Sequence, residues 1–197
     1  MHKSITVLAV VSALCLSVNQ VTGQGKKYDI KSGIVTFDNI MTMGGMKIAN
    51  KAIVYFDDYG MKECKETFED GKLKESFFSD GKTLYRLLHA NKKAYKSGDA
   101  YRGTELRCDW NEVSERDKKA GKAKQLPRMT VAGKQCDAFQ VVSSSGTTTF
   151  AGWNHICLLT ELTSKNMSSV AKAVSIQENA KVSPDKFKVP AGYQLKQ

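Results

Sequence analysis

Apolar and polar side chains alternate in short runs between residues 51 and 90, and turn signals separate these runs. The turns contain Tyr59-Gly60, Asp70-Gly71, Asp80-Gly81 and Asn91-Lys92, residue types that tolerate the positive φ of tight hairpin turns. The runs are rich in β-branched and aromatic side chains, which strands favour. The pattern therefore predicts an antiparallel meander over Lys51–Phe56, Met61–Phe68, Leu73–Phe78 and Thr83–Ala90.

The periodicity changes once, near residue 103. Leu106, Trp110 and Val113 recur at helical spacing, and Gly121 provides a suitable stop. These positions predict an amphipathic helix over Thr104–Lys119. Further strands are expected on both sides of it, over Tyr28–Phe37, Arg128–Val131, Gln135–Ser143, Thr147–Phe150, His155–Thr163 and Val170–Glu178.

Several of the predicted strands are apolar on both faces. In one of them Val54 and Phe56 share a face, while Ile53 and Tyr55 point to the other. A sheet with one wet face would alternate more cleanly. We therefore expect a mainly β (α+β) fold, in which a strongly curved antiparallel sheet wraps either a packed core or a ligand.

Residues 1–23 have the layout of a secretory signal peptide. Met1-His2-Lys3 is a short positive start, Ser4–Val18 is an apolar run, and Val21-Thr22-Gly23 places small residues where a signal peptidase cuts. The run is too short for a membrane span. We expect cleavage after Gly23, export to the periplasm or beyond, and a single domain over residues 24–197.

Charge narrows the set of partners. Cleavage takes only Lys3 from the 30 Lys and Arg and leaves all 20 Asp and Glu, so the formal charge changes from +10 to +9. A basic exported chain more often meets anionic lipid or an acidic protein than nucleic acid. The densest basic run supplies candidate headgroup contacts, although a solvated helix end is the commoner meaning: Lys118, Lys119, Lys122 and Lys124.

Four cysteines remain after cleavage, and an even number in an exported chain favours disulfides. Three pairings are possible. Because Cys136 and Cys157 lie on successive predicted strands, we favour that pair, which leaves Cys64 with Cys108. None of the spacings fits a zinc site or a redox dithiol, and we expect no metal.

The sequence offers little catalytic chemistry. No nucleophile elbow, phosphate loop or metal-binding helix motif is present, so we expect a protein that is not an enzyme and takes no cofactor. His89 ends a predicted strand and is expected at the surface, while His155 is expected to be structural.

The order of motifs resembles the LolA-like superfamily of exported lipid and lipoprotein carriers. The signal peptide leads directly into a strand, and Ser79-Asp80-Gly81-Lys82-Thr83-Leu84-Tyr85 resembles that family's turn and aromatic strand. The end, Val182–Tyr193, resembles its final strand. The resemblance implies a half-open β-barrel with one or two helices on the concave side and acyl chains held between helix and sheet.

The first functional hypothesis is therefore a monomeric periplasmic protein that holds a lipid, or the acyl chain of a lipoprotein, in an apolar cavity between sheet and helix. The alternative is an exported structural or protein-interaction domain with a filled core. Flexible methionines on both sides of Gly44-Gly45 would suit a mouth for acyl chains, but they could equally fill gaps in a core. The candidate cavity residues are Met41, Met43, Met46, Phe56, Phe68, Phe77 and Tyr85.

Overall fold

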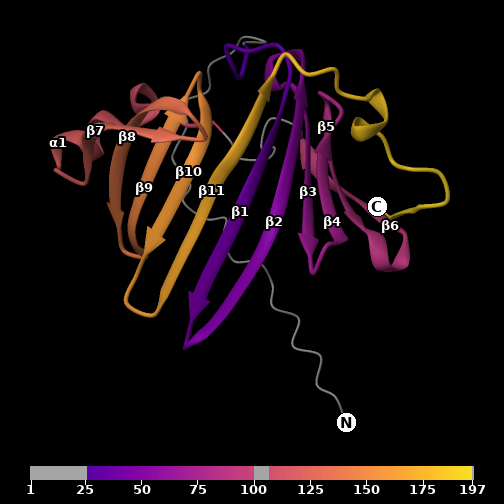
Figure 1. Ribbon diagram of the computed structural model, residues 1–197, viewed down its shortest axis with the longest axis horizontal. Coiled ribbons are helices and arrows are strands. Elements are labelled where there is room, and N and C mark those ends of the chain that lie inside the picture. The colour runs from indigo at the N-terminus through magenta and orange to yellow at the C-terminus, as the bar shows by residue number, and fades with distance from the viewer. Residues whose placement is uncertain (1–25, 100–106, 197) are drawn as a thin grey trace.

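The computed structural model describes residues 26–99 and 107–196, and its strands form one continuous twelve-stranded sheet (Figure 1). The strand order is β12-β6-β5-β4-β3-β2-β1-β11-β10-β9-β8-β7, and every pairing is antiparallel except that of β12 with β6. The strands are β1 (Gly33–Met43), β2 (Met46–Asp57), β3 (Lys62–Glu69), β4 (Lys72–Ser79), β5 (Thr83–Leu88), β6 (Lys93–Asp99), β7 (Ala123–Val131), β8 (Lys134–Ser143), β9 (Gly146–Trp153), β10 (Ile156–Thr163), β11 (Met167–Glu178) and β12 (Gln194–Lys196).

The sheet curls around a core on its inner face. Val35 of β1, Val54 of β2 and Val131 of the edge strand β7 belong to one buried cluster, although β7 lies five places from β1 in the sheet. Only a strongly curved sheet can bring these strands together. At one end of the curl, Lys134 of β8 forms an ion pair with Glu178 of β11. The result is the half-open, barrel-like sheet that the sequence predicted.

Irregular segments cover the outer face at both ends of the sheet. The 3₁₀ turn η4 (Trp110–Glu112) and the helix α1 (Glu115–Lys119) precede β7, and Trp110 packs against Phe139 of β8. At the other end, the C-terminal segment with the 3₁₀ turn η5 (Pro184–Phe187) buries Phe187 against Phe78 of β4. Two further 3₁₀ turns, η1 (Asp58–Gly60) and η2 (His89–Asn91), connect strands. These outer clusters explain why several strands are apolar on both faces.

The predicted meander over residues 51–90 is confirmed as strands β2 to β5. The region predicted as one helix over Thr104–Lys119 differs, because its described part contains the turn η4, an extended Val113 and the short helix α1. Trp110 and Val113 lie against the outer face of β8, and not across the inner face. The closing segment also differs from the expected final strand, since η5 and irregular backbone fill it and only residues 194–196 pair, with β6.

The predicted signal peptide, residues 1–23, lies outside the described residues. Among the helices that are described, none is long and apolar enough to cross a membrane.

Candidate functional site

The inner face continues beyond the core as an uncovered apolar surface at one end of β2, β1 and β11. Cross-strand partners share a face, and Met41 pairs with Ile48, while Met43 pairs with Met46 on β2 and with Met167 on β11. The exposed fractions of Met43 and Met46 are 41% and 61%, whereas Val35 and Val54 of the same face are fully buried. We call these five residues the methionine end: Met41, Met43, Met46, Ile48 and Met167.

The turn chemistry places these methionines in strands. Gly44 and Gly45 both have positive φ, 57° and 82°, and form the two-residue turn between β1 and β2. Such turns match the twist of the flanking strands. A polar pair, Asn39 with Asn50 at 2.8 Å, separates the methionine end from the packed core. In Figure 1 the β1–β2 hairpin projects beyond the neighbouring β3–β4 hairpin.

The charge at this end has one sign. Residues 39–50 and 162–171 contain Lys47 and Lys165 and no Asp or Glu. Both lysines are exposed. A hollow of about 480 Å³ lies between the two hairpin ends, lined by Thr42, Gly44, Gly45, Ser164, Lys165, Asn166, Met167 and Ser168. Flexible apolar side chains beside cations match an acyl chain attached to an anionic headgroup.

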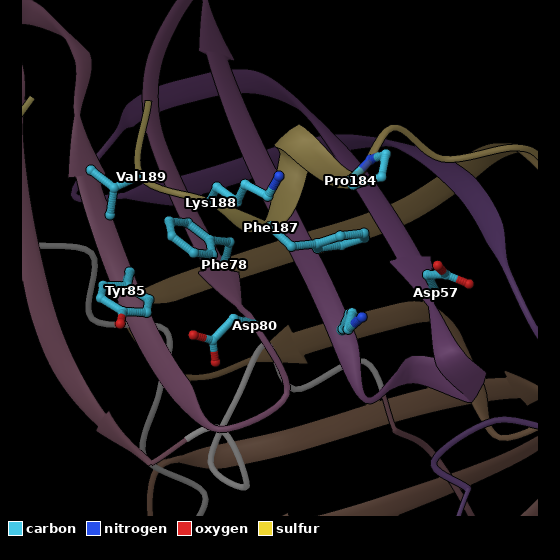
Figure 2. A pocket seen from close by; sticks show the side chains of 9 residues that line it. Asp57, Phe78, Asp80, Tyr85, Pro184, Phe187, Lys188 and Val189 are labelled. Atoms are coloured by element: carbon cyan, nitrogen blue, oxygen red, sulfur yellow. The ribbon is translucent and has the colours of Figure 1, made fainter. Parts of the chain in front are cut away.

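A second concave site lies on the outer face, under the C-terminal segment (Figure 2). It is a groove of about 450 Å³ whose apolar side chains are Phe78, Tyr85, Pro184, Phe187 and Val189, and whose charged side chains are Asp57, Lys62, Asp80 and Lys188. The rings of Phe78 and Tyr85 stack with centroids 4.8 Å apart. A volume of this size is on the usual scale of small-ligand pockets.

Two contacts fix the segment that closes this groove. Lys186 of η5 donates a hydrogen bond of 2.5 Å to Glu66 of β3, and its ammonium lies 4.1 Å from the centroid of the Tyr55 ring. Burial alone would lower the pKa of Lys186, but the hydrogen bond to Glu66 and the negative charge of that carboxylate raise it overall. The groove therefore has a fixed wall on the C-terminal side.

His89, expected at the surface, is instead half-buried in a hydrogen-bonded chain. Its Nε2 lies 2.7 Å from the Ser76 hydroxyl, and its Nδ1 lies 2.6 Å from the Tyr193 hydroxyl. Burial lowers the pKa of His89 and favours the neutral ring. The hydrogen bonds of His89 hold Tyr193 of the C-terminal segment against the sheet. Ser76 is only 2% exposed, so its hydroxyl is not an accessible nucleophile.

His155 bridges two covering segments, as its expected structural role implies. Its Nδ1 lies 3.1 Å from Asp109 and its Nε2 lies 3.4 Å from Asp29. Across residues 26–99 and 107–196, no cluster of three His, Cys, Asp or Glu side chains is arranged to hold a metal ion.

The structure distributes the predicted cavity residues over three places. The three methionines lie together at the methionine end. Phe56 is fully buried in the inner core, and Phe77 lies on the same face with Arg86 over its ring. Phe68 and Tyr85 are on the outer face, where Tyr85 lines the groove.

The predicted headgroup lysines lie at the far edge of the sheet. Lys118 bonds to Glu115 at 2.8 Å and lies over the Trp110 ring, while Lys119, Lys122 and Lys124 are exposed. Figure 1 shows α1 well apart from the β1–β2 hairpin. These lysines and the methionine end therefore do not form one surface.

One buried charge escaped the sequence reasoning. Glu63 of β3 is fully buried, and its carboxylate accepts hydrogen bonds from the Tyr28 hydroxyl and the Lys27 ammonium. Burial, together with the charge of Glu63, raises the pKa of Tyr28 well above its usual value. The sequence offered no signal for it, because the same face of β3 also carries the polar side chains of Lys65 and Thr67.

The four cysteines occupy three environments. Cys64 belongs to the outer cluster under the C-terminal segment, Cys136 belongs to the inner core, and Cys108 and Cys157 share the outer cluster near α1. All four are thiols in the structure. The favoured partners Cys136 and Cys157, and likewise Cys64 and Cys108, are not brought together.

These features define a class by architecture, namely a half-open, strongly curved antiparallel sheet with an uncovered apolar end. No family model matches the chain. No curated protein matches it either.

Solved structures share this fold at low sequence identity. An uncharacterized conserved protein from Thermus thermophilus aligns with a TM-score of 0.58 and 9% identity, over 87% of this chain and 93% of its own. MucB aligns with a TM-score of 0.50 and 13% identity, over 84% of this chain and 59% of MucB. A LolA superfamily protein from Nitrosomonas europaea aligns with a TM-score of 0.40 and 6% identity, over 83% of this chain and 92% of its own. The half-open, strongly curved sheet is thus a fold that the chain shares with the Thermus thermophilus protein and with MucB.

Proposed function

We propose that this protein is an exported binding protein that takes the acyl chain of a lipid or lipoprotein at the methionine end. One observation carries the proposal: Met43 is flanked in register by Met46 and Met167 on an open sheet face that continues the buried core. An acyl chain laid along this face would remove apolar surface from water, worth about 25 cal/mol per Å² buried.

The charge at the methionine end favours a lipid with an anionic headgroup. Lys47 and Lys165 flank the apolar surface, and the two segments that form it contain no carboxylate. A lysine near an anionic membrane surface contributes about 1 kcal/mol. The predicted signal peptide supports a location where exported lipids and lipoproteins are present.

The test is native mass spectrometry of delipidated protein after incubation with palmitate, and again with phosphatidylglycerol vesicles. The variant Met43→Asn/Met46→Asn removes the apolar surface at exposed positions, where the fold tolerates polar side chains. A matched control is Val142→Asn/Val174→Asn, because these valines are 46% and 49% exposed but lie elsewhere. We expect wild type and control to carry one acyl chain or lipid, and the methionine variant to lose at least tenfold in affinity.

A wild-type mass that stays bare with both probes would overturn the proposal. Equal losses in both double variants would show that any exposed apolar residue suffices, and would remove the methionine end as the site. Vesicle binding should also weaken at high salt, because screening reduces the attraction of Lys47 and Lys165 to the headgroups.

A second candidate is a protein-interaction domain, which the closed inner core favours. Tyr28, Val54 and Phe56 are fully buried there, together with Ile156 and Leu158 of β10. Neither of the two hollows described above, among residues 26–99 and 107–196, lies between this core and the helix. If native spectra show no lipid, the same methionine variants should be tested for loss of a protein partner.

A further inference from the structure

Cys108 and Cys157 lie against each other on the outer face of the sheet. Arg107 forms an isolated antiparallel bridge with Ile156, and the Cys108 amide donates to the His155 carbonyl at 3.0 Å. The bridge and this hydrogen bond fix Cys108 beside the start of β10. The side chains of Cys108 and Cys157 are close enough for each thiol to shift the pKa of the other.

A glycine makes this approach possible. Gly152 of β9 pairs directly with Cys157. A Cβ atom at Gly152 would lie 2.6 Å from the Cys108 carbonyl oxygen and 3.1 Å from the Cys108 sulfur. Any larger residue at position 152 would displace Cys108, so the missing side chain provides the space in which the two sulfurs meet.

The other two cysteines are held away from this pair. Asp137, Gly152 and Cys157 are aligned across three strands and share the outer face. Cys136, the neighbour of Asp137, therefore points to the inner face, where it is fully buried in the core cluster. Cys64 lies in the cluster under the C-terminal segment, at the opposite end of the sheet.

We propose that Cys108 and Cys157 are a modification site that is oxidised to a disulfide, and that Cys64 and Cys136 remain thiols. The bond would join the segment that covers β8 and β9 to β10. It would therefore fix in place Trp110 and Val113, which pack in the same cluster as both cysteines.

The oxidant is a disulfide, either oxidised glutathione or a protein disulfide in the compartment to which the chain is exported. One cysteine thiolate attacks it, forms a mixed disulfide and releases one thiol of the oxidant. The other cysteine then attacks the mixed disulfide and releases the second thiol. Two S–H bonds are lost, one S–S bond forms, and the two electrons and two protons leave with the reduced oxidant.

While both residues are thiols, Cys157 is the sulfur that ionises more readily. Its interaction with the Cys108 side chain lowers the pKa of the Cys157 thiol despite its burial. The same interaction, together with burial, raises the pKa of the Cys108 thiol. A mixed disulfide at Cys108 removes this interaction, so the attack of Cys157 on it depends on proximity. Cys108 lies on the covering segment, so its sulfur can meet the oxidant before that segment packs against the sheet.

The experiment is peptide mapping of the chain without residues 1–23, which has four cysteines, purified and equilibrated with reduced and oxidised glutathione. Free thiols are blocked with N-ethylmaleimide in denaturant, and the digest is analysed by mass spectrometry without reduction. We expect one linked pair of peptides, containing Cys108 and Cys157, and full alkylation of Cys64 and Cys136. Four alkylated cysteines, or a link of Cys136 to Cys157 or of Cys64 to Cys108, would overturn the proposal.

Variants separate the pair from the other thiols. Cys108→Ser should release Cys157 to alkylation, and Cys157→Ser should release Cys108. The matched control Cys136→Ser should keep the link. Reduction of the wild type and of the control should lower Tm by roughly 5–10 °C, while Tm of Cys108→Ser should not respond to reductant. A wild-type Tm that does not change on reduction would also contradict the Cys108–Cys157 disulfide.

Discussion

At the scale of single residues, the buried carboxylate of Glu63 joins the segment before β1 to the sheet. It accepts a hydrogen bond of 2.5 Å from Lys27, and a second from the Tyr28 hydroxyl. The Tyr28 ring also packs edge-on against Phe56, with centroids 5.1 Å apart. The segment before β1 is therefore fixed to the sheet by both a polar and an apolar contact.

We expect Tyr28→Phe to lower the free energy of unfolding by about 1–3 kcal/mol, because it removes one donor from a buried carboxylate without changing the packing of the ring. Urea denaturation measures the change. Tyr59→Phe is the control, since Tyr59 is only half-buried. A loss no larger than that of Tyr59→Phe would show that Glu63 does not depend on the Tyr28 hydroxyl.

The buried thiol of Cys64 should make the free energy of unfolding depend on pH. Burial, followed by the charge of Glu66, raises the pKa of its thiol from 9.0 to about 12. Below pH 9 the thiol is protonated in both the folded and unfolded states. Between about pH 9 and 12 only the unfolded chain ionises, so the contribution of Cys64 is fully present below pH 9 and is lost as pH rises toward 12.

The measurement compares wild type with Cys64→Ala by urea denaturation from pH 7 to pH 11. The variant should be less stable at neutral pH, because it leaves a cavity. The difference should shrink above pH 9, because only the wild type has the thiol that ionises on unfolding. A difference that stays constant with pH would contradict the raised pKa.

At the scale of elements, the C-terminal segment is held against the sheet mainly by the side chain of Phe187. Phe187 of η5 is buried among Phe78, Leu87 and Ala94, and Lys186 beside it bonds to Glu66. Ser183 caps the turn by accepting from the Asp185 amide. The segment thus acts as a strap that covers β3 to β6 on the outer face.

Phe187→Ala should lower the free energy of unfolding by about 3–5 kcal/mol and release the strap, because it removes a large buried ring and leaves a cavity. Hydrogen exchange followed by mass spectrometry should show faster exchange over residues 182–196, with β1 and β11 unchanged. Lys188→Ala, at an exposed neighbouring position, is the control. Faster exchange throughout the sheet would mean that the strap and sheet unfold together.

At the scale of the whole molecule, the single continuous sheet predicts cooperative unfolding. Trp153 packs against the inner core and Trp110 packs in the outer cluster near α1. Both clusters share strands β8 to β10, so neither can be lost while the other persists. We expect the two environments to unfold at one midpoint.

The variants Trp110→Phe and Trp153→Phe each leave one tryptophan as a fluorescent reporter. Each should give the same urea midpoint by fluorescence as by circular dichroism. A fluorescence midpoint that differs from the circular dichroism midpoint in either variant would show that the inner and outer clusters unfold separately.

The sequence by itself determined what local chemistry decides. Asp-Gly turns and alternating runs located β2 to β5, and the apolar character of both strand faces predicted a sheet with strong curvature. The predicted strands stopped at Phe37 and resumed at Lys51, whereas β1 continues to Met43 and β2 begins at Met46. Turn geometry and strand periodicity act over a few residues, so they can be read without knowledge of distant contacts.

Only the tertiary structure decided which residues meet. The Thr104–Lys119 pattern fitted a helix, yet the short turn η4 is flanked by the extended residues Asp109 and Val113. Packing of Trp110 and Val113 on β8 outweighs the weak local preference for a helix. The cysteines show the same limit: strand order suggested Cys136 with Cys157, but the pleat directs these two side chains to opposite faces. Which apolar face is filled and which stays open depends on segments far apart in the chain, and neither composition nor spacing contains that information.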